Sequence, residues 1–504
     1  MRILLLTLLC CSAFSVQSQK INYEKLLADL DVMVPAQLKH WNVAGVAIGV
    51  VHKDKLVYAK GFGYRDVERK LPVTAETFFM IGSNTKAFTA SVIGILGEKH
   101  NRNYLDAPVR EIFPQLQFKD EFTNSHVTPR DMMSHRTGLP RGDWFNYGSA
   151  NFTDSLYMRL GNVEPQAAFR TQYIYNNYMF NILGNISEKL TGKKWEQNVR
   201  ELIFEPIGMM QSGTNSADWL KNDNRSKSYT VRNDSMIPIM SDGAQFTAMP
   251  AGSILSNIPE LTKWLTTWIY AGIYNGKQII PKSYYQQALS AHSSILPSFD
   301  PERPEIQLNS YGLGFDLTSY RGHYLVYHGG RISGFTSNLS FMPQDSLGVI
   351  VLINQNSSPL YFNLMYSIYD RLLKLPPVDW NKREFEKRKK DRENLAMELK
   401  KDSVERITVT TPSLQLTEYT GSYFNAGIGY LRIGMDNGKL AANLNRGSKM
   451  ALKHYHHNVF QTAVINEGVL PIKLNFSINR RGKVENLILL DNSTSIEYIF
   501  NRSN

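Results

Sequence analysis

The spacing of apolar residues divides the chain into a long mixed region and a shorter strand-rich one. From about residue 22 to 375, short apolar runs such as residues 46–51 and 347–353 alternate with longer stretches of helical patterning. The short runs are typical of strands, and the longer stretches of helices that pack against a sheet. We therefore expect an α/β or α+β body over residues 20–378.

The pattern breaks at Pro376 and Pro377 and changes twice after them. Residues 379–411 are so rich in charge that they can bury little apolar area, and we expect them to form a solvated connecting helix. Further on, short runs of alternating apolar and polar residues are separated by turn signals such as residues 436–438. These features predict a small antiparallel β domain over residues 412–504.

Residues 1–19 have the pattern of a secretory signal peptide. The positive charge of Arg2 precedes an apolar run over residues 3–16, which is too short to cross a bilayer comfortably. Removal of this segment would take away Cys10 and Cys11, the two cysteines of the sequence, and with them any disulfide or thiol chemistry. A lipid-modified Cys11 is an alternative, but Cys10 stands where Gly, Ala or Ser would precede it. We expect a soluble protein that is secreted or periplasmic.

Charge and composition narrow the classes of partner. The formal net charge of +11 is dispersed along the chain, and together with export this argues against nucleic acid as a partner. After the signal peptide no stretch reaches the roughly 18 consecutive apolar residues of a spanning helix, so we expect no transmembrane segment in the mature chain. The histidines of residues 454–457 lack an acidic or cysteine partner at a recognisable ligand spacing, and no metal or other cofactor is expected.

The pair Ser83 and Lys86 carries the strongest candidate chemistry. The two residues stand three positions apart at the start of a helix that Phe88, Val92 and Leu96 predict, so their side chains share one face. A serine becomes a nucleophile when an adjacent base takes its proton and nearby donors stabilise the negative charge that develops on its target. The alternative interpretation is a capped helix with a surface lysine.

Two further segments complete a pattern that resembles one enzyme superfamily. Residues 175–177 (Tyr-Asn-Asn) resemble the Tyr-x-Asn element of class C β-lactamases and of their D,D-peptidase and esterase relatives. Residues 328–330 (His-Gly-Gly) resemble the third element of that family, which is usually Lys-Thr-Gly and in many relatives is His-x-Gly. The resemblance implies that this element lies on an edge strand of the site. The order of the three motifs also fits, and residues 127–140 and 251–253 resemble further stretches of the family. The resemblance to the serine β-lactamase and penicillin-binding superfamily covers roughly residues 22–370, and the end of the chain resembles a lipocalin-like β domain.

The resemblance implies a fold and a mechanism. The fold is an antiparallel sheet flanked by helices, with an all-helical subdomain, followed by a small antiparallel β-barrel-like domain. Ser83 would attack a carbonyl and form an acyl-enzyme, while Lys86 and Tyr175 would share the removal and the return of its proton. Which of the two is the formal base is left open.

The same resemblance implies the groups that bind the substrate. Asn177 would form hydrogen bonds with the lysine and with a substrate amide or carbonyl. The backbone N–H groups of Ser83 and Arg331 would form an oxyanion hole. His328 and Gly330 would line the substrate site.

The departures at His328 and Gly329 indicate the substrate class. The Lys-Thr pair of a β-lactamase offers a cation and a hydroxyl to a carboxylate, whereas His is mostly neutral near pH 7 and Gly has no side chain. Arg331 could restore a cation if its side chain turned into the cleft. We expect an exported serine hydrolase of the peptidase or esterase type, acting on D-amino acid peptides, amides or small esters. Efficient β-lactam hydrolysis and a non-catalytic penicillin-binding scaffold are the alternatives.

Glu164, which precedes Pro165, is a further candidate for a catalytic role. It could be a deacylating base as in class A β-lactamases, but the Asn that follows in that family is missing, so we expect Glu164 to be a loop residue. The partner is expected to be a small-molecule or peptide substrate. The natural substrate and the oligomeric state are left open.

Overall fold

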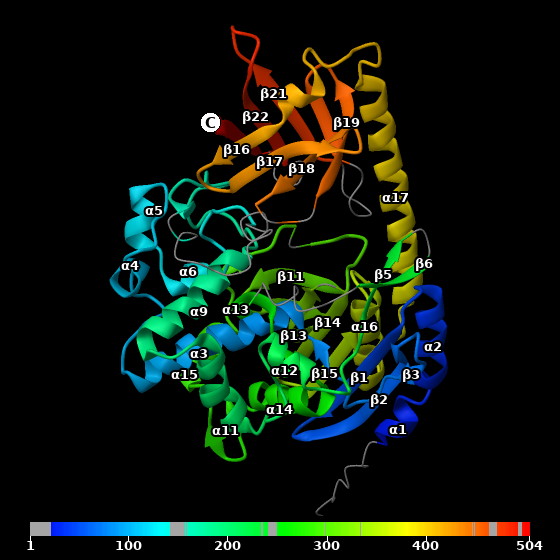
Figure 1. Ribbon diagram of the computed structural model, residues 1–504. Coiled ribbons are helices and arrows are strands. Elements are labelled where there is room, and N and C mark those ends of the chain that lie inside the picture. The colour runs from blue at the N-terminus through cyan, green and yellow to red at the C-terminus, as the bar shows by residue number, and fades with distance from the viewer. Residues whose placement is uncertain are drawn as a thin grey trace, which may run out of the picture.

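A sheet-containing body, a β-barrel and one long helix make up the structure (Figure 1). The computed structural model describes residues 22–141, 157, 159–232, 235–239, 249–297, 299–332, 334–445, 447, 449–462, 471–491 and 496–503. The expected signal peptide and both cysteines lie outside these ranges. Within them, no helix combines the length and the apolar character that crossing a bilayer requires.

The centre of the body is an antiparallel sheet, to which nine strands contribute among the described residues. Both strand runs expected from the sequence are confirmed, since they form β1 and β15, which pair with each other. The strands follow the spatial order β10 (Ser293–Ser294), β11 (Ile306–Tyr311), β12 (Asp316–Tyr320), β13 (His323–Ile332), β14 (Phe335–Met342), β15 (Leu347–Ile353), β1 (Gly45–His52), β2 (Lys55–Asp66) and β3 (Leu71–Pro72).

Helices cover both faces of this sheet, which explains why β1 and β15 are apolar along almost their whole length. On one face, Val46 and Ile48 of β1 pack with α2 (Leu30–His40) and α16 (Leu360–Leu372). The opposite face packs against α14 (Ile258–Ile269). The sheet therefore forms the middle layer of the body, as the fold class predicted.

Two helices beside the sheet carry much of the candidate chemistry. The predicted helix after Ser83 is confirmed as α3 (Thr85–Lys99), which is buried from Thr85 to Leu96 because other elements surround it. It packs against α9 (Asn177–Thr191). In the described part of the body, the other α-helices are α1 (Tyr23–Leu26), α4 (Val109–Ile112), α5 (Glu121–His126), α6 (Pro129–Met133), α10 (Trp195–Val199), α11 (Glu205–Ile207), α12 (Ser216–Leu220), α13 (Met249–Gly252) and α15 (Lys282–Ala288). Short strands pair as β4 (Phe79–Met80) with β7 (Leu255–Ser256), β5 (Ser228–Arg232) with β6 (Ser235–Ile239), and β8 (Ile273–Tyr274) with β9 (Lys277–Gln278).

The charged segment forms α17 (Trp380–Glu405), a helix of 26 residues, as its composition predicted. Of its residues, all of which the structure describes, Trp380 alone is buried. Trp380 Nε1 donates a hydrogen bond of 3.1 Å to Asp370 Oδ2 in α16. Near the other end, the Tyr455 hydroxyl donates to the carbonyl of Asp402 at 2.8 Å. The helix thus contacts the body where it begins and the barrel where it ends (Figure 1).

The predicted β domain is confirmed as a closed antiparallel barrel, for which the described residues supply eight strands. Its interior contains side chains such as Tyr423, Leu431 and Phe476. The barrel rests on the helical part of the body, where Ile428 is buried and a Cβ on Gly427 would lie 3.1 Å from a methyl group of Val163. The strands are β16 (Gly421–Asn425), β17 (Gly429–Asp436), β18 (Lys439–Leu444), β19 (Met450–His456), β20 (Val459–Thr462), β21 (Lys473–Ile478), β22 (Val484–Asp491) and β23 (Ile496–Ser503).

Candidate active site

Ser83 and Lys86 lie where a tight helical turn over Gly82–Asn84 runs into α3. The Lys86 side chain is in the first turn of this helix and has no exposed surface. Its Nζ donates a hydrogen bond of 3.1 Å to Ser83 Oγ. The contact expected from the three-residue spacing is confirmed, and the surface lysine of the alternative interpretation is wrong because Lys86 is buried.

The Lys86 amine also binds oxygens from two other segments. Its Nζ donates to Oδ1 of Asn177, the first residue of α9, at 2.7 Å and to the carbonyl of Ala251 in α13 at 2.9 Å. An ammonium group has three N–H donors and no acceptor. The oxygens of Ser83, Asn177 and Ala251 match those donors, so this environment suits the charged form of the lysine.

Tyr175 lies next to this amine. Lys86 Nζ is 4.9 Å from the centre of the Tyr175 ring. The same ring is 4.3 Å from the ring of His135 and 6.3 Å from that of His328, measured between centroids. The structure thus brings together side chains from three separate segments that the sequence motifs predicted to meet.

Asn176 fixes the segment that carries Tyr175. Its Oδ1 accepts a hydrogen bond from the Met179 N–H at 3.0 Å and so caps α9. Its Nδ2 donates to the carbonyl of Pro140 at 2.6 Å, and its backbone N–H donates to His135 Nδ1 at 3.0 Å. Because all of these contacts are buried, the position of the neighbouring tyrosine is set by two packed segments.

β13 offers backbone groups to the site at an unpaired edge. The resemblance implied an edge strand, whereas the observed β13 lies inside the sheet between β12 and β14. β12 pairs with β13 from Tyr320 to Asp316, and Asp316 is opposite Tyr327. Beyond that pair, residues 328–332 have β14 on one side and, in the described part of the chain, no strand on the other. The end of β12 therefore creates a local edge that can receive an extended substrate.

Two glycines let this edge approach the turn that carries Ser83. A Cβ on Gly330 would lie 2.0 Å from the carbonyl oxygen of Ile81. Gly82 has a φ of +53°, and a Cβ there would lie 2.8 Å from the backbone nitrogen of Arg331. Only glycine fits such contacts without a shift of backbone. The close approach brings the backbone segments of Ser83 and Arg331 into contact.

His328 is buried and neutral. Its Nε2 lies 2.8 Å from the Tyr311 hydroxyl, and its Nδ1 lies 2.7 Å from the carbonyl oxygen of Gly329. Because a carbonyl can only accept, Nδ1 carries the proton and Nε2 accepts from the tyrosine. Burial, together with the positive charge of Lys86, lowers the pKa of His328 to about 3. The expected neutral state near pH 7 agrees with this shift.

The Arg331 side chain lies on the ring of Tyr361. Its guanidinium carbon is 5.8 Å from the ring centre, and Nη2 donates a hydrogen bond of 3.3 Å to the Tyr361 hydroxyl. Gly329 makes room for this ring, since a Cβ there would lie 3.1 Å from Tyr361 Cε2. The cation is exposed and stands beside the backbone edge, on the side of α16.

Sequence reasoning missed three contributors to this cluster. His135 is fully buried with a φ of +57°, and its pKa lies well below the usual value because of burial and the charge of Lys86. Tyr311 binds His328, and the carbonyl of Ala251 binds the amine. His135 and Ala251 belong to stretches that carry the family resemblance, which was the available signal. A backbone carbonyl, or one tyrosine among 26, cannot be recognised as part of a site from a single sequence.

Glu164 is a loop residue, as predicted. It is exposed and forms an ion pair with Lys119. Exposed pairs of this kind contribute little to stability.

Comparisons with known proteins agree with this fold. A family model described as Beta-lactamase matches residues 31–368, and one described as a domain of unknown function (DUF3471) matches residues 405–502. The unguisins hydrolase ungD' of Aspergillus campestris is 28% identical over 433 residues, which cover 80% of this chain and 77% of that protein. Beta-lactamase-like protein 4 of Dictyostelium discoideum is 26% identical over 385 residues, which cover 70% of this chain and 65% of that protein.

A solved structure of similar fold is described as the octameric penicillin-binding protein homologue from Pyrococcus abyssi. It has a TM-score of 0.60 and 22% sequence identity, and the match covers 94% of this chain and 99% of that one. At this identity the likeness shows the fold alone. The family model spans most of the body, and the chain therefore belongs to the Beta-lactamase family.

Proposed function

We propose that this chain is an exported serine hydrolase that acts through an acyl-enzyme on peptides, amides or small esters, including those of D-amino acids. Family membership and relatives that are named as hydrolases support hydrolytic activity. The observation that carries the serine mechanism is the hydrogen bond between Lys86 Nζ and Ser83 Oγ beside the Tyr175 ring. A protein that only binds has no need of these three groups together. The apolar start of the sequence supports export.

The residues of the cluster suffice for acyl transfer. Ser83 Oγ forms a bond to the substrate carbonyl carbon while its proton passes to Tyr175 or Lys86. The oxygens around Lys86 favour its ammonium form, and a nearby positive charge favours the phenolate of Tyr175, which makes Tyr175 the better candidate for the base. The N–H groups of Ser83 and Arg331 stabilise the carbonyl oxygen as it becomes negative.

The reaction then proceeds in two stages. The leaving amine or alcohol takes up the proton as its bond to the carbonyl carbon breaks, and an acyl group stays on Ser83. Water attacks this ester, the carboxylic acid leaves, and the serine hydroxyl forms again. No other reactant is required.

Neutral acyl substrates fit this site better than substrates with a free carboxylate. His328 is uncharged, and its two nitrogens are engaged by Tyr311 and by the carbonyl of Gly329. The unpaired edge at residues 328–332 can form backbone hydrogen bonds with an extended peptide or amide. These features favour peptidase or esterase activity over efficient β-lactam hydrolysis.

Arg331 favours a second candidate function, acylation by β-lactams. Its guanidinium is exposed beside Gly329, at the strand that would bind the substrate. A carboxylate that approached the edge from this side would meet a permanent cation. Penicillin would then acylate Ser83 even if release were slow.

Replacement of the nucleophile tests the proposal. In Ser83→Ala, turnover of a chromogenic ester should fall by about a thousandfold or more, because the acyl-enzyme cannot form. The thermal transition should stay in place. Ser91→Ala is a matched control, since Ser91 is a buried hydroxyl in the same helix that donates to the carbonyl of Ala87. It should keep its turnover.

Active-site labels separate the candidate functions. A fluorophosphonate should label the wild type at Ser83 and should not label Ser83→Ala. A fluorescent penicillin that labels the same residue would support the second candidate. Unchanged ester turnover in Ser83→Ala would show that another group is the nucleophile.

A further inference from the structure

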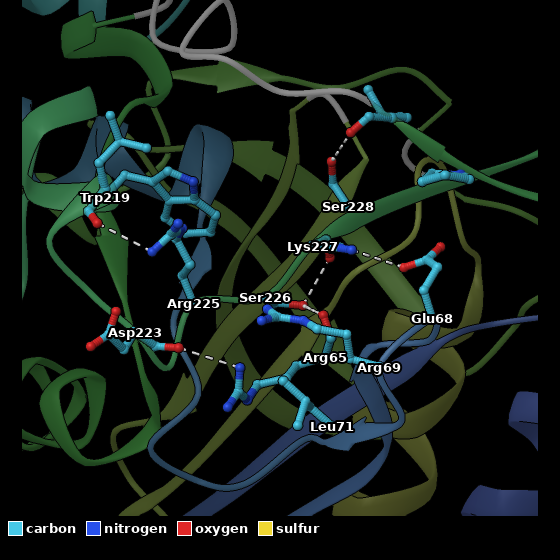
Figure 2. Close-up of a pocket in the computed structure, with 13 residues that line it drawn as sticks. Arg65, Glu68, Arg69, Leu71, Trp219, Asp223, Arg225, Ser226, Lys227 and Ser228 are labelled. Carbon is cyan, nitrogen blue, oxygen red and sulfur yellow. Dashed lines mark hydrogen bonds and ion pairs between the residues drawn. The ribbon is translucent and has the colours of Figure 1, made fainter.

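A cavity of about 700 Å³ lies between the end of β2, helix α12 and the β5–β6 hairpin (Figure 2). Its volume is within the range of small-molecule sites. In the part of the chain that the structure describes, none of Ser83, Lys86, Tyr175 and Asn177 lines it. The cavity is therefore separate from the candidate active site.

Acidic groups neutralise two of the cations that line this cavity. Asp66 is buried and forms ion pairs with two lining residues, with Arg69 at 2.6 Å and with Lys227 at 3.2 Å. Lys227 also forms an ion pair with Glu68 at 3.1 Å. These residues form a closed network of charges at one side of the cavity.

Two other cations keep their charge available. Arg65 donates a hydrogen bond of 3.3 Å to the backbone carbonyl of Asp223. Arg225 donates to the carbonyls of Leu220 and Asn222 at 3.2 and 2.8 Å. Within the described residues, neither guanidinium forms an ion pair with a carboxylate. Figure 2 shows the Arg225 guanidinium beside Trp219 and the Arg65 guanidinium beside the backbone carbonyl of Asp223.

The rest of the lining is largely apolar. Leu71, Trp219, Leu220, Pro238 and Ile239 contribute to the wall. Trp219 is almost completely buried and packs edge to face against a phenylalanine ring of the body, so this wall is rigid. A ligand that fills the cavity must therefore combine an anionic end with an apolar part.

We propose that this cavity binds a small carboxylic acid that carries an apolar chain or side chain. Arg65 and Arg225 hold the carboxylate, because a guanidinium presents a planar set of donors that matches two carboxylate oxygens. The apolar part lies against Trp219 and Ile239. An inorganic anion has no apolar part that could contact this wall.

The cavity adjoins both chain segments that lead to the candidate active site. The Ser226 N–H donates to the carbonyl of Phe78 at 3.0 Å, and Phe78 directly precedes β4 and the turn of Ser83. On the other side, Ser228 packs against Gly334, just beyond β13. A carboxylic acid bound here is therefore next to the catalytic segments without contact to the reacting groups. The inference goes beyond the proposed function, since binding requires no turnover.

Binding of hexanoate to the full-length protein tests the inference. Calorimetry should show saturable binding. The tryptophan fluorescence should change as hexanoate binds, and Trp219→Phe should abolish this fluorescence change. Arg225→Gln and Arg65→Gln should each weaken the binding about tenfold or more, since each removes hydrogen bonds to a charged group. Within the described residues, the Arg65 side chain makes a single hydrogen bond, of 3.3 Å, so its replacement should leave the fold intact. Ester turnover should stay unchanged in both variants.

The controls separate this site from general attraction of anions. Lys221→Gln removes one positive charge close to Asp223 but outside the cavity, and it should bind hexanoate normally. Hexanamide, which has the same chain without the charge, should not compete. Absence of hexanoate binding by the wild type, or wild-type affinity for hexanoate in both arginine variants, would overturn the inference. Inorganic phosphate that binds as tightly as hexanoate would overturn it as well, because the apolar wall would then have no role.

Discussion

At the scale of single residues, the candidate site consists of buried polar groups whose charge states are set by their neighbours. Lys86 is surrounded by oxygens that match an ammonium group, whereas His328 and His135 are buried near that same positive charge. A positive charge disfavours the protonated form of a nearby imidazole. One cation and two neutral imidazoles are therefore mutually consistent.

Acid should destabilise the fold through these two histidines. Burial first, and the charge of Lys86 next, lowers the pKa of His328 to about 3 and that of His135 well below its usual value. Both stay neutral in the folded protein, whereas both take up a proton below about pH 6.5 in the unfolded chain. Their stabilising contribution is complete above about pH 6.5 and is lost as the pH falls toward 3.

Urea unfolding between about pH 7.5 and about pH 4.5 measures this effect, and each histidine can contribute up to about 1.4 kcal/mol per pH unit to the slope. In His328→Gln the slope should be smaller by about that amount. His126→Gln, which changes an exposed histidine in α5, should keep the slope of the wild type. Equal slopes in the wild type and in His328→Gln would contradict the neutral buried imidazole.

At the scale of elements, one buried carboxylate ties α6 to the segment that leads to Tyr175. Asp131 accepts hydrogen bonds from Arg136 Nε at 2.6 Å and from Arg170 Nε and Nη2 at 2.8 Å. Burial alone would raise the pKa of Asp131, but the hydrogen bonds of Arg170 and the charge of Arg136 outweigh it and lower the pKa. The charged carboxylate thus holds two elements of the site together.

Asp131→Asn should therefore reduce both stability and turnover. Loss of the buried charge leaves two arginines without their partner, which should cost about 2–3 kcal/mol, below the usual range for a buried pair because both arginines are partly exposed. Turnover should fall because Tyr175 is no longer held. Asp106→Asn is the matched control, since Asp106 pairs with Arg130 and is nearly half exposed, and it should cost less than about 1 kcal/mol.

Thermal unfolding and ester turnover measure the two effects. A variant Asp131→Asn with the stability and turnover of the wild type would show that the segment is held by other contacts.

The elements that the sequence predicted are those with a strong local pattern. The runs that became β1 and β15 are continuously apolar, and α17 is highly charged, so their type follows from burial or exposure alone. The place of β13 inside the sheet could not be predicted. It depends on where β12 stops pairing, which is a tertiary contact between strands.

Only part of the candidate site could be predicted from local sequence. Ser83 and Lys86 are close in sequence, so helix geometry alone predicts their contact. The resemblance supplied Tyr175 and Asn177, which meet the lysine across many intervening residues. The left-handed backbone of His135 is stabilised by its surroundings and not by its own propensity, which is why no local pattern indicated it.

At the scale of the whole molecule, the barrel is held at two separate places. Arg406 Nε, just beyond α17, donates to the carbonyl of Tyr455 in β19 at 2.7 Å. At the opposite side, Ile428 is buried against the body and Arg159 Nη1 donates to its carbonyl at 3.4 Å. The length and orientation of α17 must therefore place the barrel where Ile428 can contact the body.

Deletion of Lys389 should break the contact between the barrel and the body. One residue turns a helix by about 100° and shortens it by about 1.5 Å, so the barrel can no longer meet the body through Ile428 while it stays bound to α17. Amide hydrogen exchange should increase in residues 159–163 and 427–429. Lys389→Ala changes an exposed side chain at the same position without a change of length, and it should show the exchange of the wild type. Undisturbed exchange after the deletion would mean that the barrel is held at one end only.

This geometry makes α17 tolerant of one kind of change and intolerant of another. Because most of its side chains are in water, almost any helix-forming residue can replace them, and the composition of this segment is free to drift during evolution. The count of residues is not free, since every insertion or deletion alters both the reach and the rotation of the helix. Related chains that share this architecture should therefore keep the length of the connector far better than its sequence.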